Sequence, residues 1–87
     1  MKVKFAKYAV KAITSLDART KQRIRSAIQA IPSGDIKPIQ GSKTLYRLRV
    51  GDWRVLFSYI LDEDGDDAVM VERISPRGEV YKSWRLK

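Results

Sequence analysis

The sequence contains neither cysteine nor histidine. Without cysteine there is no disulfide bond, no thiol nucleophile and no thiolate metal site. Without histidine there is no serine–histidine–aspartate triad, no histidine acid–base pair and no histidine-based zinc site. No apolar run is long enough for a signal peptide or a membrane-spanning helix, and charge begins at Lys2. We therefore expect a soluble cytoplasmic protein without a metal ion or a small-molecule cofactor.

The net charge is strongly positive. Eighteen lysines and arginines against ten acidic residues give +8, and five of the acidic residues fall within residues 62–67. A small domain with this balance is expected to bind a polyanion: nucleic acid, an acidic protein or an anionic membrane surface. The length of 87 residues leaves room for a single domain, which we place over residues 1–87.

The first third of the chain predicts one short strand and two helices. Residues 2–6 alternate polar and apolar side chains, which is typical of a strand. From Lys7 the apolar spacing becomes helical, and we expect a helix over about residues 7–15. Asp17 is an N-cap candidate for a second helix that ends at Pro32. The apolar stripe of that helix consists of Ile24, Ala27, Ile28 and Ile31.

The remaining sequence predicts three strands joined by two turns. The strands cover Leu45 to Val50, Trp53 to Leu61 and Ala68 to Ile74. Gly51-Asp52 is a two-residue hairpin turn, and the acidic residues 62–67 form the second turn. The expected order is β-α-α-β-β-β. This is an α+β fold, with an antiparallel sheet and a helical hairpin packed on one face.

The predicted hairpin sorts its side chains onto two chemically different faces. With Gly51-Asp52 as the loop, strand alternation places an apolar set on the face beneath the helices. That set is Tyr46, Leu48, Val50, Trp53, Val55 and Phe57. The opposite face carries Arg47, Arg49 and Arg54, with no acid expected nearby. Repeated arginine favours an anion site over an ordinary solvated face, because the guanidinium binds phosphate through two hydrogen bonds and keeps its charge.

Other candidate residues flank this hairpin. Arg77 follows the last predicted strand, and Tyr81 follows four residues later. Further basic residues that can contact RNA or phosphate are Lys43, Lys82 and Arg85. Tyr81 can act as a base, as a stacking surface or as a packed residue at the edge of the sheet. The ordinary pKa of a tyrosine side chain is about 10, so base catalysis requires neighbouring arginines that lower it.

The run Gly41–Phe57 resembles the central motif of the RelE/ParE toxin superfamily, and Arg77-Gly-Glu-Val-Tyr81 is similar to its closing motif. The opening strand and the two helices also fit, so the resemblance covers nearly the whole chain. It implies a microbial-RNase-like fold and a toxin of a type II toxin–antitoxin system. It also implies a cognate antitoxin as a partner.

The resemblance implies two alternative activities, and the residues themselves leave a third open. RelE-like members cleave mRNA on the ribosome, by attack of a 2′-hydroxyl on the adjacent phosphate and without a metal ion. ParE-like members inhibit DNA gyrase and are not nucleases, and a non-catalytic RNA- or ribosome-binding module is the third alternative. Carried over by position, Arg54, Arg77 and Tyr81 would be catalytic in a nuclease. Arg47 and Arg49 would act electrostatically only, because a guanidinium does not exchange protons at ordinary pH.

Overall fold

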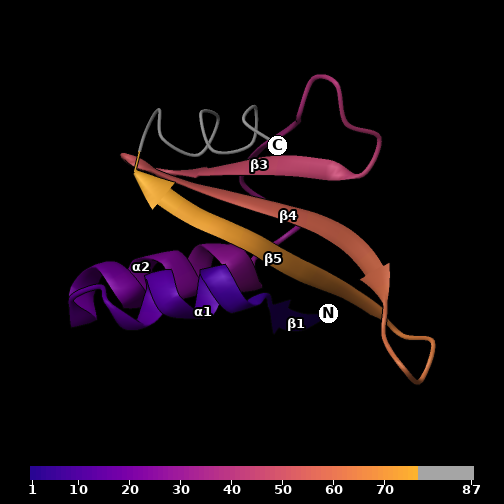
Figure 1. Cartoon of the computed structure of the whole chain (residues 1–87), viewed down its shortest axis with the longest axis horizontal. Coiled ribbons are helices and arrows are strands. Elements are labelled where there is room, and N and C mark those ends of the chain that lie inside the picture. The colour runs from indigo at the N-terminus through magenta and orange to yellow at the C-terminus, as the bar shows by residue number, and fades with distance from the viewer. Residues whose placement is uncertain (77–87) are drawn as a thin grey trace.

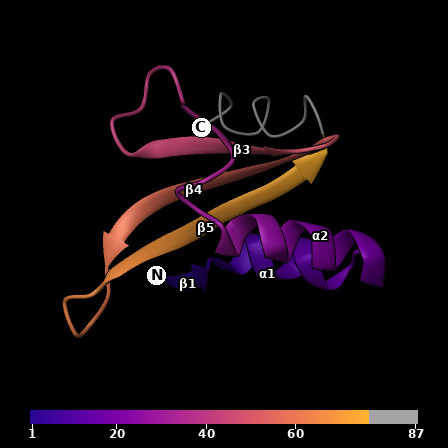
Figure 2. The same ribbon diagram turned by 180° about the vertical axis from the view of Figure 1, so that it is seen from behind.

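The computed structural model describes residues 1–76. In chain order the elements are β1 (Lys2–Phe5), α1 (Lys7–Thr14), α2 (Ala18–Gln29), β2 (Asp35–Pro38), β3 (Leu45–Val50), β4 (Trp53–Leu61) and β5 (Asp67–Pro76). The five strands form one sheet in the order β1-β5-β4-β3-β2. Both helices lie on the same side of this sheet (Figure 1), and the view from behind shows the same layering (Figure 2). The α+β class and the helical pair on one face are therefore confirmed.

The sheet differs in two respects from the sequence-based expectation. It is mixed rather than wholly antiparallel, because β1 pairs in parallel with β5 and aligns Val3 with Val69. It also contains an additional edge strand, β2, which pairs with β3 and aligns Lys37 with Arg47. β2 contains only one large aliphatic side chain, Ile36, and ends in a proline, so it lacks the alternating pattern of a strand.

The first helix and the start of the second agree with the prediction, but α2 ends at Gln29, so that Ile31 lies beyond it and is still buried. The Asp17 side chain accepts a hydrogen bond from the Thr20 backbone N–H at 3.2 Å, and bonding to Thr20 holds the pKa of this carboxyl below its usual value. Ile24 and Ile28 of α2 are buried, as are Ala9 and Ile13 of α1. These side chains pack on the sheet and fix the helices to one face.

The β3–β4 hairpin has the predicted register. Val50 pairs with Trp53, Arg49 with Arg54, and Tyr46 with Phe57. Gly51 has a φ of +60°, as expected at the first central position of a type II′ turn. The apolar side chains of this hairpin face the helices: Leu48, Val50, Val55 and Phe57 belong to the main core, and Tyr46 and Trp53 pack against it.

A cluster of opposite charges ties β1 to the loop between β4 and β5. The Lys2 Nζ atom lies 2.7 Å from Asp62 Oδ2, 3.5 Å from Asp64 Oδ2 and 3.7 Å from Asp66 Oδ2. Asp62 Oδ1 also accepts hydrogen bonds from two backbone N–H groups of its own loop, at 2.9 Å each. The Lys2 ammonium and these N–H groups lower the pKa of Asp62 to about 2, and Asp62 in turn raises the pKa of Lys2.

Within residues 1–76, neither helix is long and apolar enough to cross a lipid bilayer.

Candidate nucleic-acid interface

The sheet face opposite the helices carries a cluster of cations from four adjacent strands. We call it the basic face and define it by Lys37, Arg47, Arg49, Arg54 and Arg73. Strand pairing arranges these residues in two rows. One row runs Lys37–Arg47–Leu56–Arg73 from β2 to β5, and the next runs Asp35–Arg49–Arg54–Ser75. Cations at adjacent positions repel one another, so the cluster favours an anionic ligand.

Arg47 is paired with an acid that the sequence analysis did not anticipate. Its Nη2 atom donates to Asp35 Oδ1 at 3.1 Å, and 11% of the Arg47 side chain is exposed. The expectation of no acid on this face is therefore wrong. The acid was missed because Asp35 belongs to β2, whose pairing with β3 brings it beside the arginines. This ion pair orients the Arg47 guanidinium. It also lowers the positive electrostatic potential of the basic face, because the Asp35 carboxylate offsets the charge of Arg47.

Arg54 is held rigidly at the β3–β4 turn. Its Nη1 atom donates to the carbonyl oxygens of Gly51 at 2.9 Å and Trp53 at 3.0 Å, and the residue is buried at 7% exposure. A second guanidinium approaches this turn from α2. A Cβ atom added to Gly51 would lie 2.8 Å from Nη2 of Arg23. The turn is therefore enclosed by two cations, of which only Arg54 was predicted.

Two other predicted contact residues are accessible. Arg49 is exposed at the centre of its row, and Lys43 is exposed in the loop between β2 and β3. Arg49, Arg47 and Arg54 are thus brought together on one face, while Lys43 lies in the loop before β3. The remaining predicted residues, Arg77, Tyr81, Lys82 and Arg85, lie outside the described part of the chain.

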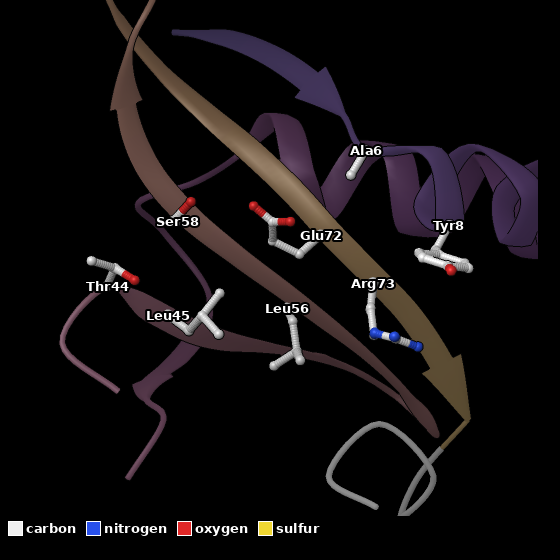
Figure 3. A pocket seen from close by; sticks show the side chains of 8 residues that line it. All are labelled: Ala6, Tyr8, Thr44, Leu45, Leu56, Ser58, Glu72 and Arg73. Carbon is white, nitrogen blue, oxygen red and sulfur yellow. The ribbon is translucent and has the colours of Figure 1, made fainter. Parts of the chain in front are cut away.

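A pocket of about 280 Å³ opens beside the basic face. Its lining residues are Ala6, Tyr8, Thr44, Leu45, Leu56, Ser58, Glu72 and Arg73. Figure 3 shows Arg73 and Tyr8 at one end, Glu72 and Leu56 in the middle, and Ser58, Thr44 and Leu45 at the other end. The Arg73 Cζ atom lies 5.0 Å from the centroid of the Tyr8 ring, which is a cation–π contact. The pocket therefore combines a cation, a carboxylate and an aromatic ring.

Sequence reasoning missed Tyr8, Glu72 and Arg73 as site residues. Tyr8 lies on α1 and reaches the site because β1 pairs with β5 only as far as Val71, which leaves α1 beside the rest of β5. Glu72 lies where the register shifts between Val71 and Arg73, opposite Phe57 and Leu56 of β4. Neither placement has a local signal in the sequence. Arg73 was missed as well, because strict alternation from Val71 would put it on the helix side, and the irregularity at Glu72 reverses this.

The acidic loop offers a different arrangement of charge. Carboxylate oxygens of Asp62, Asp64 and Asp66 lie within 4.8 Å of one another, which is a spacing compatible with metal binding. The Lys2 ammonium lies among these same three carboxylates. A cation of the chain itself therefore lies within this cluster and offsets part of its negative charge.

The fold and the basic face define a class of small α+β proteins that gather arginines on the sheet face opposite a helical pair. The family model described as "ParE toxin of type II toxin-antitoxin system, parDE" matches residues 3–81. The chain is 30% identical to Toxin RelE3 of Methanocaldococcus jannaschii over 89 residues, which cover 93% of this chain and 96% of that protein. It therefore belongs to the RelE/ParE superfamily, the toxins of type II toxin–antitoxin systems.

Solved structures agree with this assignment. The RelB-RelE antitoxin–toxin complex of Methanococcus jannaschii contains a chain that matches with a TM-score of 0.68 and 25% identity, covering 92% of this chain and 96% of that chain. The archaeal RelE-RelB complex of Pyrococcus horikoshii OT3 contains another, with a TM-score of 0.63, 29% identity and coverage of 88% and 94%. The fold of this chain is that of the RelE toxins.

Proposed function

We propose that this toxin is a metal-independent endoribonuclease that cleaves mRNA on the ribosome, and that the basic face is its active face. The observation that carries the proposal is the convergence of cations from β2, β3, β4 and β5 on the sheet face opposite the helices. RNA is the polyanion that such a face suits best, because each nucleotide presents a phosphate to the guanidiniums and a 2′-hydroxyl that can react.

The chemistry needs little beyond correctly placed positive charge. The 2′-oxygen forms a bond to the adjacent phosphorus, the bond from phosphorus to the 5′-oxygen breaks, and the 2′-proton ends on the departing 5′-oxygen. The products are a 2′,3′-cyclic phosphate and a 5′-hydroxyl. Negative charge builds on the phosphorane oxygens in the transition state, and fixed guanidiniums stabilise it without reorganising.

The described arginines differ in how they could take part. The Arg54 guanidinium is oriented by the carbonyl oxygens of Gly51 and Trp53, which suits a group that stabilises a transition state at a fixed point. Arg49 is exposed and suits the binding of a flanking phosphate. Arg47 is oriented by Asp35 and acts beside them as a second phosphate ligand. Arg77 and Tyr81 complete the proposed catalytic set, and Lys82 and Arg85 the proposed RNA-binding set.

The test is inducible expression of the intact chain, followed by mapping of mRNA 5′ ends and measurement of protein synthesis. We expect mRNA to be cut at ribosome-bound codons and protein synthesis to stop. Arg54→Ala and Arg77→Ala should each reduce cleavage at least tenfold. Arg19→Ala is the matched control, because Arg19 is an exposed arginine of α2 and lies outside the basic face. Cleavage that is unchanged in both Arg54→Ala and Arg77→Ala would show that the basic face is not the active face.

A second candidate function is inhibition of DNA gyrase without nuclease activity, favoured by the match to the ParE family model. The same expression experiment separates the two. A gyrase inhibitor would induce the DNA-damage response and leave mRNA intact. Purified toxin would then block DNA supercoiling by gyrase, and it would leave translating ribosomes unaffected.

The proposed partner besides the ribosome and mRNA is a cognate antitoxin. Both structural relatives described above are complexes of a RelE toxin with RelB. An acidic antitoxin segment that becomes ordered on binding would neutralise the basic face and compete with RNA. Co-expression of the toxin with the product of the adjacent gene, followed by co-purification, tests this partnership.

A further inference from the structure

We propose that the Tyr8–Arg73 pair is a stacking platform for one base of a single-stranded RNA, and that the pocket beside it receives the edge of that base. The inference rests on the proposed RNA substrate and adds a base-binding site to a face so far described by its phosphate contacts. It requires the aromatic ring of Tyr8, a residue that no motif in the sequence singled out.

The first argument is the exposure of the ring. Tyr8 is 60% exposed, one of the largest exposures among the large hydrophobic residues of the described chain. Its ring already contacts the Arg73 guanidinium, with Cζ 5.0 Å from the ring centroid. A flat aromatic surface next to a cation is the combination on which single-stranded RNA stacks its bases, because every base has a π-face.

The second argument is the charge inside the pocket. Glu72 lies in the middle of the lining, between the Tyr8–Arg73 end and the Thr44–Leu45 end (Figure 3). A carboxylate repels phosphate, so the sugar–phosphate chain is expected to follow the cations instead. The edge of a base carries N–H donors that a carboxylate accepts. The pocket therefore suits a base, and the rows of arginine beside it suit the backbone.

The third argument is the position of Arg73 relative to the arginines that are proposed to bind and cleave RNA. Arg73 occupies the same cross-strand row as Arg47, with Leu56 between them. Arg54 lies in the adjacent row. A nucleotide with its base on Tyr8 would therefore have its neighbouring phosphates over the proposed catalytic arginines. The platform would then fix the position of the scissile bond along the RNA.

The test measures binding of a fluorescein-labelled 12-nucleotide 2′-O-methyl-polyuridine to the full chain by anisotropy at several salt concentrations. The 2′-O-methyl group prevents 2′-oxygen attack, so binding is measured without cleavage. Tyr8→Leu should weaken binding about tenfold while the slope of log K against log salt stays constant, because stacking displaces no counterion. Tyr8→Phe should bind like the parent chain. Arg73→Gln should weaken binding and also make the slope shallower, by about 0.7.

The matched control is Tyr59→Leu, the same change at another exposed tyrosine, 42% exposed and on the helix-facing side of β4. It should leave RNA affinity unchanged. Equal affinities of Tyr8→Leu and the parent chain would overturn the inference, as would an equal loss in Tyr59→Leu. A weaker antitoxin complex with unchanged RNA binding would also overturn it, since Tyr8 would then contact protein. Failure of the proposed function is a separate result: the parent chain would bind the oligonucleotide but leave ribosome-bound mRNA uncut.

Discussion

The two faces of the β3–β4 hairpin come from the same fifteen or so residues and do opposite things. On one face Leu48, Val55 and Phe57 are buried against the helices. On the other, Arg47, Arg49 and Arg54 are gathered at adjacent positions. Strand alternation separates the two sets completely. A substitution in either strand is therefore expected to affect stability on the apolar face and the proposed ligand binding on the basic face.

The separation has an energetic cost on the basic face. Arg49 and Arg54 are directly opposite each other in the ladder, where like charges destabilise a sheet. The structure offsets this repulsion locally, since Arg54 donates to two turn carbonyls and Arg47 pairs with Asp35. Packing of the apolar face against the helices stabilises the hairpin despite this repulsion between arginines. The comparison indicates that core packing on one face stabilises the hairpin enough to accommodate the repulsion between arginines on the other face.

The largest expected effect is that of Phe57→Ala on the apolar face. Phe57 is fully buried in the core, and the loss of its ring leaves a cavity, so we expect the free energy of unfolding to fall by about 3–5 kcal/mol. Urea denaturation monitored by circular dichroism measures this change. Lys43→Ala, at an exposed loop position, should change the same quantity by less than about 0.5 kcal/mol. A Phe57→Ala variant as stable as the parent would contradict the assignment of the core face.

An intermediate effect is expected from Arg49→Gln on the basic face. The guanidinium is exposed and we propose that it binds phosphate rather than packs, so stability should stay within about 0.5 kcal/mol of the parent. Affinity for the 2′-O-methyl oligonucleotide should fall, with a salt slope shallower by about 0.7. Asp35→Asn should have the opposite effect, because it releases Arg47 from its acidic partner and makes the face more positive. If both substitutions weaken RNA binding, the net charge of the face does not govern its affinity.

The smallest effect is expected at the acidic loop, where opposite charges are already paired. The pKa of Asp62 is lowered to about 2 from a usual 3.8, so its contribution to stability is complete above pH 4. That contribution should disappear as the pH falls from about 4 to about 2. The raised pKa of Lys2 means that its own contribution persists through neutral pH and disappears only above about pH 10.5. Thermal midpoints measured between pH 6 and pH 2 should fall less steeply for Lys2→Met than for the parent chain.

Elements encoded by local patterns were predictable from the sequence. The β3–β4 register follows from alternation around Gly51-Asp52, and the start of α2 follows from the Asp17 cap. β2 was not predictable, because its four residues include only one large aliphatic side chain and a proline. The parallel pairing of β1 with β5 was missed because it joins residues more than sixty positions apart. No local pattern specifies such a pairing.

The candidate site was predictable to the same degree. Arg47, Arg49 and Arg54 could be placed on one face because they lie within a single hairpin. Asp35, Tyr8 and Arg73 join the site through β2, α1 and β5, so their places depend on the tertiary fold. The prediction therefore described the cations of one hairpin and missed the acid and the aromatic ring that surround them.

The parallel pairing of β1 with β5 bears on when this toxin becomes active during its synthesis. β5 is the strand that pairs with both β1 and β4, and it begins at Asp67. A nascent chain that has not reached this residue leaves β1 without a partner in the sheet, and it lacks Arg73 of the basic face. Because β1 and β5 pair across more than sixty residues of sequence, the chain between them must close into a loop before their contacts form. We therefore expect a product that ends before Asp67 to have an incomplete basic face and to be non-toxic.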